Sequence, residues 1–130
     1  MLQITKRNIK IMKILAVDDD RDIVEVIKII LEDEGYEVST LTSGIDVLKV
    51  IALIRPDLIL LDVMLGGIDG RDICRQIKNH DLFKAIPVIM ISASHNLQSL
   101  LEFPGSPDDF IAKPFDIDRL VKIVKAQLAA

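Results

Sequence analysis

Three short apolar runs in this chain end in charged residues, which limits the folds that it can adopt. The runs and the residues that end them are Ile14–Val17 with Asp18–Asp20, Leu58–Leu61 with Asp62, and Phe110–Ala112 with Lys113. Short runs without polar residues are typical of strands buried on both faces, as in parallel sheets. If these strands are parallel, their charged ends meet at one edge of one sheet. We expect the chemistry of the protein at that edge.

Strand-like and helix-like patterns alternate along the chain. We predict strands at 14–17, 37–41, 58–62, 87–92 and 109–113. Helical spacing of apolar residues is expected after Asp20, after Gly44, after a glycine-rich loop at 66–70, at Asn96–Glu102 and from Asp116. The alternation predicts an α/β fold: a doubly wound five-stranded parallel sheet with the flavodoxin-like (βα)5 strand order 2-1-3-4-5.

This topology places the acidic residues at a defined point. In doubly wound sheets the active crevice lies beyond the carboxyl ends of the strands, where the strand order reverses. With the order 2-1-3-4-5, that point falls between the first and third strands. These are the strands that end in Asp18–Asp19 and in Asp62, so the acidic cluster is expected in the crevice.

The size and charge of the chain narrow its class. At 130 residues it is expected to form one domain, at 12–130, after a flexible basic leader at 1–11. The net charge of −4 disfavours direct contact with nucleic acid, which needs a basic surface. No apolar run approaches the ~18 residues of a membrane span. The single cysteine, Cys74, falls among apolar helix positions and is interpreted as a core residue. We therefore expect a cytoplasmic protein without a membrane partner.

The acidic residues need a positive partner. Asp18, Asp19 and Asp62 bring three carboxylates into one crevice, against the single ammonium of Lys113. Two carboxylates ~5 Å apart repel by roughly 3 kcal/mol at an effective dielectric of ~20. Protonation of a carboxylate or binding of a divalent cation would relieve this repulsion. All-oxygen ligands favour Mg²⁺, with Mn²⁺ as a substitute.

Residues at other strand ends suit a phosphoryl group. Ser92 ends the fourth predicted strand, so its hydroxyl is expected in the same crevice, where it can donate to a phosphoryl oxygen. With Mg²⁺ and Lys113 counted, the site is near neutral and can receive the oxygens of such a group. Each residue alone is a weak signal, since an Asp, Ser or Lys at a strand end is usually a cap or a solvated side chain. Asp20 is interpreted as a helix cap.

Together these residues resemble the motifs of bacterial response-regulator receiver domains. The matching segments are Val17–Asp20, Leu61–Leu65 with Asp69–Gly70, Ile91–Ala93 and Lys113–Phe115, in order and at family spacing over 12–128. The resemblance implies that Asp62 is the phosphoacceptor. Its carboxylate would attack the phosphohistidine of a sensor histidine kinase or a histidine phosphotransfer protein.

The resemblance also implies roles for the neighbouring residues. Asp18, Asp19, Asp62 and the backbone carbonyl of Met64 would hold Mg²⁺. Lys113, before a cis bond to Pro114, would pair with the phosphoryl oxygens. Such a protein is a signalling phosphoacceptor that catalyses only its own phosphorylation and dephosphorylation.

A conformational switch is implied as well. Ser92 would move toward the phosphoryl group and Phe110 would turn inward with it, although simple core packing is an equally good interpretation of Phe110. The output surface would consist of the fourth helix, the fifth strand and the fifth helix. The same face is a candidate homodimer interface.

Three features depart from the family pattern. Gly66 stands where the family usually has proline, so the loop after the phosphoacceptor is expected to be freer. Pro104 and Pro107 are expected to shorten or distort the fourth helix. The chain ends after the fifth helix, as a stand-alone receiver or as a piece of a longer regulator.

Two other functions remain as alternatives. A phosphatase resembling the haloacid dehalogenase-like family would use Asp18 as nucleophile and Asp20 as general acid. However, Arg21–Asp22 follows where that family pattern has Gly-Thr or similar. A degenerate receiver that acts only as a binding module would lack a site residue, and none is missing here.

Overall fold

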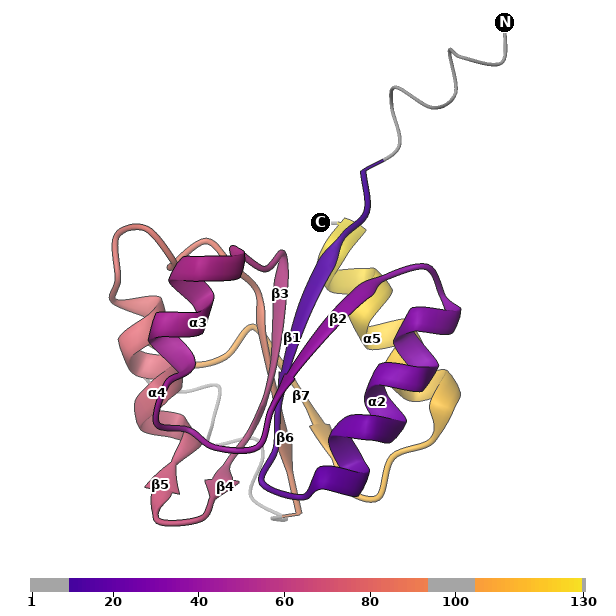
Figure 1. Cartoon of the computed structure of the whole chain (residues 1–130), viewed down its shortest axis with the longest axis horizontal. Coiled ribbons are helices and arrows are strands. Elements are labelled where there is room, and N and C mark those ends of the chain that lie inside the picture. Colours follow the sequence, from indigo (N-terminus) through magenta and orange to yellow (C-terminus); the bar gives the residue numbers. More distant parts are fainter. Residues whose placement is uncertain (1–9, 94–104, 130) are drawn as a thin grey trace, which may run out of the picture.

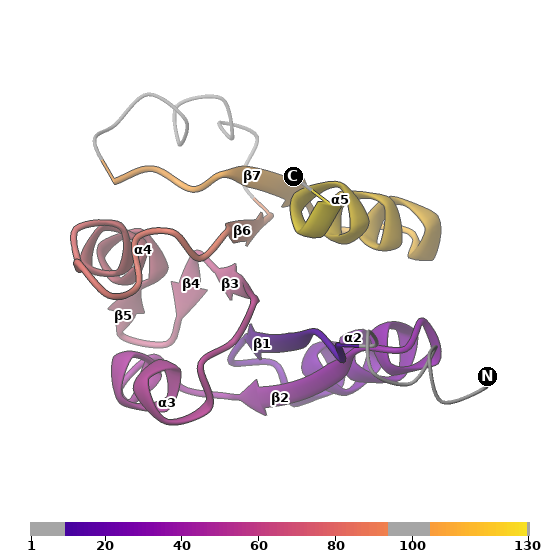
Figure 2. The ribbon, with the colours of Figure 1, turned by 90° about the horizontal axis from the view of Figure 1, so that it is seen from above.

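A computed structural model describes residues 10–93 and 105–129 and shows a three-layer α/β arrangement (Figures 1 and 2). The elements, in chain order, are β1 (Lys13–Val17), α2 (Arg21–Asp33), β2 (Glu37–Leu41), α3 (Val47–Ile54), β3 (Leu58–Asp62), β4 (Met64–Leu65), β5 (Ile68–Asp69), α4 (Gly70–Lys78), β6 (Val88–Ser92), β7 (Asp109–Ala112) and α5 (Ile117–Ala129). The helix expected at Asn96–Glu102 lies outside the described residues, as do Pro104 and most of the leader.

The main sheet has five parallel strands in the order β2-β1-β3-β6-β7. Because β4 and β5 form a separate hairpin, this is the predicted order 2-1-3-4-5. Val17 is level with Leu61, and Asp62 is level with Ile91. The residues that follow β1 and end β3 therefore lie side by side at one edge of the sheet, which is the lower edge in Figure 1.

Alternation along the strands builds two cores, one on each face of the sheet. Leu15, Ile59 and Met90 point toward α3 and α4, where they pack against residues such as Ile51 and Ile77. The intervening residues pack against α2 and α5 on the other face; the buried strand members are Ile14, Ala16, Leu58, Leu60, Ile89, Ile91 and Ile111. Every residue of β3 and β6 is buried, because parallel strands with helices on both faces have no solvent side. The sheet is thus a rigid base for its polar edge.

Helix starts match the capping residues in the sequence. Asp20 caps α2 by accepting a hydrogen bond from the Asp22 backbone N–H at 2.9 Å, which confirms its interpretation as a cap. Asp69 caps α4 in the same way through the Arg71 N–H. A side-chain oxygen at the N-cap satisfies one of the free N–H groups of the first turn. The caps fix where each helix leaves the edge that carries the acidic residues.

The segment expected to be a glycine-rich loop contains a short hairpin. β4 and β5 pair in antiparallel fashion, with Met64 opposite Asp69 and Leu65 opposite Ile68, and the turn between them is Gly66–Gly67. Gly66 has a φ of +64°, a left-handed value that favours glycine. Gly70 belongs to α4 rather than to the loop. The hairpin lies at the lower edge of the sheet in Figure 1, beside the end of β3.

Candidate functional site

The structure brings three predicted carboxylates together at the edge of the sheet. Ligand oxygens of Asp18, Asp19 and Asp62 all lie within 4.8 Å of one another. Asp18 and Asp62 are 1% and 5% exposed, whereas Asp19 is exposed. Asp18 also accepts a hydrogen bond from the Asp20 backbone N–H at 2.9 Å. The first two are therefore held inside the protein, and the third faces the solvent side of the same cluster.

Lys113 supplies the positive charge. It follows β7, and its Nζ lies 2.8 Å from Asp18 Oδ2 and 3.3 Å from Asp62 Oδ2. Its backbone N–H donates to the Ser92 carbonyl at 2.9 Å, which continues the β6–β7 ladder past the end of the strand. The peptide bond from Lys113 to Pro114 is cis, as expected. The ammonium bridges two carboxylates that come from different strands.

The surroundings set the charge state of the site. Burial, together with the charge of Asp18, raises the pKa of Asp62 to about 6, against the opposing effect of Lys113. Burial also disfavours the charged form of Lys113, but its hydrogen bond to Asp18 and the two nearby carboxylates outweigh this and raise its pKa. At pH 7, Lys113 is therefore protonated, and Asp62 is mostly in the carboxylate form that can act as a nucleophile.

The donor set fits a hard divalent cation. Three carboxylates that converge against one ammonium leave an excess of negative charge, and all the available donors are oxygens. Oxygen donors of this kind suit Mg²⁺, which takes few protein ligands and retains several waters. Met64 is separated from the end of β3 by Val63 alone, and its backbone N–H donates to the Asp62 carboxylate. The residues present are therefore chemically suited to a magnesium ion.

The sequence and the fold of known proteins match this chain over most of its length. The family model described as the response regulator receiver domain matches residues 14–125. The chain belongs to the response regulator receiver domain family. This membership argues against the phosphatase alternative, in which Asp20, here a helix cap, would act as a general acid.

Relatives of this receiver domain include regulators of greater length. The DNA-binding response regulator MtrA of Mycolicibacterium paratuberculosis is 36% identical over 117 residues, which cover 89% of this chain and 51% of MtrA. RpaA of Synechocystis, described as a DNA-binding dual master transcriptional regulator, is 35% identical, with 89% of this chain and 48% of RpaA covered. The chain thus spans about half the length of these curated relatives.

Two solved structures show the same fold. The signal receiver domain of a signal transduction histidine kinase from Syntrophus aciditrophicus superposes with a TM-score of 0.82 at 34% identity, covering 91% of this chain and 90% of that one. The response regulator receiver domain protein of Methanospirillum hungatei also has a TM-score of 0.82, at 30% identity, with 92% and 95% covered. The flavodoxin-like receiver fold is confirmed.

The two predicted switch residues of the receiver domain lie on neighbouring strands. Ser92 ends β6, is 3% exposed and follows Ile91, the residue level with Asp62. Phe110, on β7, is half-buried and packs against the core on the α3 and α4 side. Ser92 is thus buried near the end of β3 that carries Asp62, while Phe110 is half-buried against the core.

Backbone amides complete the site and were not among the predicted site groups. The Gly66 N–H donates to Asp19 Oδ2 at 3.1 Å, and the Met64 N–H donates to Asp62. Both amides belong to the β4–β5 hairpin. A signal for this hairpin was present, since two glycines between Leu65 and Ile68 are typical of a tight β-turn. Residue type alone does not show which carboxylate such an amide will reach.

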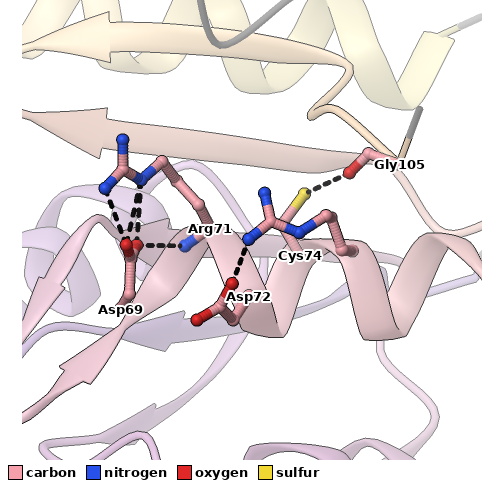
Figure 3. A network of polar contacts seen from close by, with 6 residues as sticks. Asp69, Arg71, Asp72, Cys74 and Gly105 are labelled. Atoms are coloured by element: carbon pink, nitrogen blue, oxygen red, sulfur yellow. Dashed lines mark hydrogen bonds and ion pairs between the residues drawn. The ribbon is translucent and has the colours of Figure 1, made fainter. Parts of the chain in front are cut away.

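The far end of the hairpin is tied to α4 (Figure 3). Asp69 accepts from the Arg71 backbone N–H at 2.9 Å and from the Arg71 guanidinium at 2.7 Å and 3.0 Å. The hydrogen bond with Arg71 holds the pKa of Asp69 below its ordinary value. Cys74, on the same helix, is buried and contacts the Gly105 carbonyl. Burial raises the pKa of its thiol to about 11, which agrees with its interpretation as a core residue.

Within residues 10–93 and 105–129, helices are too short or too polar to cross a bilayer.

Proposed function

We propose that this receiver domain is a phosphoacceptor in which Asp62 takes a phosphoryl group from a histidine kinase or a histidine phosphotransfer protein. The observation that carries the proposal is the buried Asp62 carboxylate, 3.3 Å from the Lys113 ammonium and clustered with Asp18 and Asp19. In the reaction, an Asp62 oxygen forms a bond to phosphorus as the phosphorus–nitrogen bond of phosphohistidine breaks. The imidazole nitrogen keeps the electron pair of that bond.

The other site residues have supporting roles in this proposal. Asp18, Asp19, Asp62 and the Met64 carbonyl would hold Mg²⁺, or Mn²⁺ in its place, which would offset negative charge on the transferred group. Lys113 keeps its positive charge at pH 7. Its ammonium would pair with the oxygens of the phosphoryl group once Asp62 has become an acyl phosphate. Ser92, buried at the end of β6, would donate its hydroxyl to a phosphoryl oxygen. The chain would act only on its own aspartate, not on a separate substrate.

An apolar groove beside the site suits the phosphodonor protein. Its volume is about 510 Å³, and it lies between the start of α2 and the segment after β7. The lining residues are Asp22, Ile23, Val26, Ala93, Lys113, Pro114 and Phe115. Because Lys113 also contacts Asp62, a protein seated in this groove would hold its phosphohistidine next to the nucleophile. We propose the groove as the docking surface for that donor.

The broader setting follows from the same proposal. A partner kinase with a cytoplasmic phosphohistidine would make this a cytoplasmic protein. The output surface would include β7 and α5, together with the segment between β6 and β7, and it is also the proposed homodimer face.

With a net charge of −4, the described domain itself would not bind nucleic acid. We assign residues 12–130 to the receiver domain and 1–11 to a leader.

The first test of this function is phosphorylation by a small acyl-phosphate donor with Mg²⁺, read by intact mass. We expect wild type to gain one phosphoryl group and Asp62→Ala to gain none. An adduct that survives in Asp62→Ala but is lost in Asp18→Ala would instead support the phosphatase. A wild-type protein without any adduct would support the degenerate binding module.

The docking groove has a separate test. Val26 is 50% exposed on α2 and lines the groove, whereas Leu53 is 74% exposed on α3, across the sheet. We expect Val26→Asp to slow transfer from a phosphorylated histidine phosphotransfer protein about tenfold or more, because an apolar contact is replaced by a charge that must be desolvated. Transfer from acetyl phosphate should be unchanged.

Leu53→Asp is the matched control, because it adds the same charge at an exposed apolar position on the other face. It should transfer at the wild-type rate from both donors. Equal slowing by Val26→Asp with the protein donor and with acetyl phosphate would show that the substitution damages the site rather than the docking surface.

A further inference from the structure

The three carboxylates of the site are held to different degrees. Asp18 is bound by the Lys113 ammonium at 2.8 Å and by the Asp20 N–H at 2.9 Å. Asp62 is bound by Lys113 and by the Met64 N–H. Asp19 is exposed, and among the described residues its carboxylate is held by one hydrogen bond, from the Gly66 N–H at 3.1 Å. The orientation of Asp19 therefore depends on the position of a single backbone amide.

That amide is held in place by the hairpin around it. The hairpin begins at Met64, whose N–H is bound to Asp62, and it ends at Asp69, which caps α4 and pairs with Arg71 (Figure 3). Between these ends, Leu65 pairs with Ile68 across the turn. Beyond the hairpin, the Gly70 N–H donates to the Val63 carbonyl at 2.7 Å. The turn is thus fixed on both sides, so the Gly66 N–H points at Asp19 from a defined position.

A proline at this position would prevent this contact. Gly66 has a φ of +64°, and a proline at this position has a φ near −65° and no N–H to donate. The residue that departs from the usual family proline is therefore the one that supplies the hydrogen bond. Besides the freer loop expected from glycine, the departure from proline adds a backbone donor at this position.

We propose that the Gly66 N–H is a positioning group for the metal: it orients the Asp19 carboxylate so that Asp19 can join Asp18 and Asp62 as a ligand. This rests on the proposed function, in which these residues hold Mg²⁺. Asp19 Oδ2 accepts from Gly66, and one oxygen of Asp19 lies within 4.8 Å of ligand oxygens of Asp18 and Asp62. Partners that orient a metal ligand in this way typically change metal affinity by about 10–100-fold when they are removed.

The decisive variant removes only the N–H. Incorporation of glycolic acid in place of Gly66 changes the Leu65–Gly66 amide into an ester. The ester lacks the N–H, but it keeps the backbone conformation and, like glycine, has no side chain. We expect the Kd for Mg²⁺, measured by calorimetric titration without any phosphodonor, to rise about tenfold or more. Gly66→Pro, which also removes the donor, should weaken binding at least as much.

Gly66→Asn is the matched control, because asparagine tolerates left-handed φ and keeps the backbone N–H. Its Kd for Mg²⁺ should stay within about twofold of wild type, since the donor remains. If the ester binds Mg²⁺ with the wild-type Kd, the inference is wrong, while the proposed function stands. If wild type itself binds no Mg²⁺, the metal-dependent function fails together with the inference.

A measurement without metal checks the hydrogen bond directly. In ¹⁵N-labelled wild type, the Gly66 amide resonance should shift on Asp19→Ala, because the amide loses its acceptor, and the Gly67 resonance should move less. An unchanged Gly66 resonance in Asp19→Ala would overturn the proposed positioning role, whatever the metal titration shows.

Discussion

Asp62→Asn should make the metal-free protein more stable at pH 7, by as much as about 3 kcal/mol. Burial and the charge of Asp18 raise the pKa of Asp62 from the ordinary 3.8 to about 6 in the folded protein. A difference of this size corresponds to about 3 kcal/mol, by which the ionised carboxylate disfavours folding. Asparagine has nearly the same shape and carries no charge, so this cost is removed.

The pH dependence gives the sign of the effect. Between about pH 4 and pH 6 the folded protein binds more protons at Asp62 than the unfolded chain, so the free energy of unfolding of wild type falls as the pH rises. Above about pH 6 the full cost of ionisation is present, and below about pH 4 it is absent. Urea unfolding in chelator from pH 4 to pH 8 should therefore show the advantage of Asp62→Asn growing up to about pH 6 and then levelling off.

Two comparisons make the prediction specific. Asp20→Asn removes a carboxylate near the same edge but keeps an exposed N-cap, a role that asparagine fills equally well, so its stability should stay within about 0.5 kcal/mol of wild type. Saturating Mg²⁺ should stabilise wild type by about 2.7 kcal/mol at a hundredfold excess over Kd and Asp62→Asn by less, since the variant would lack one of the proposed charged ligands. Lower stability of Asp62→Asn than wild type at pH 7 in chelator would contradict the argument.

Gly70→Ala should destabilise the protein by about 3 kcal/mol or more. A Cβ at this position would lie 2.0 Å from the Asp62 carbonyl oxygen and 3.1 Å from Val63 Cα. Both contacts are with backbone atoms, which cannot rotate away as a side chain could. Forced overpacking usually costs about 1–3 kcal/mol, and a clash with the fixed Asp62–Val63 peptide unit belongs at the upper end of that range or beyond. The strain should fall on the end of β3, where Asp62 is located.

Chemical denaturation with and without Mg²⁺ measures both consequences. We expect a lower midpoint for Gly70→Ala and a weaker response to Mg²⁺, because the displaced strand end carries Asp62, a proposed ligand. Gly67→Ala is the matched control: a Cβ at Gly67 has no atom within 4 Å, so this variant should stay within about 0.5 kcal/mol of wild type. Equal midpoints for Gly70→Ala and wild type would show that α4 can move away from β3 without loss.

The sequence by itself determined the sheet and the identity of the acidic residues. Continuous apolar runs such as Leu58–Leu61 require burial on both faces, and this is a local property of the chain. Once the strands are parallel, the residues after β1 and at the end of β3 must meet at one edge, as Asp18, Asp19 and Asp62 do. The cap at Asp20 was also readable, because its partner is two residues away.

Only the tertiary structure decided how those carboxylates are held. The Lys113 ammonium reaches Asp18 across 95 residues, and the Gly66 amide reaches Asp19 across 47. The close approach of Gly70 to the Asp62 carbonyl likewise depends on how α4 packs against β3. Two of these groups, the Gly66 N–H and the Asp62 carbonyl, belong to the backbone. Residue type does not show what a backbone group will contact, because that contact depends on the path of the folded chain.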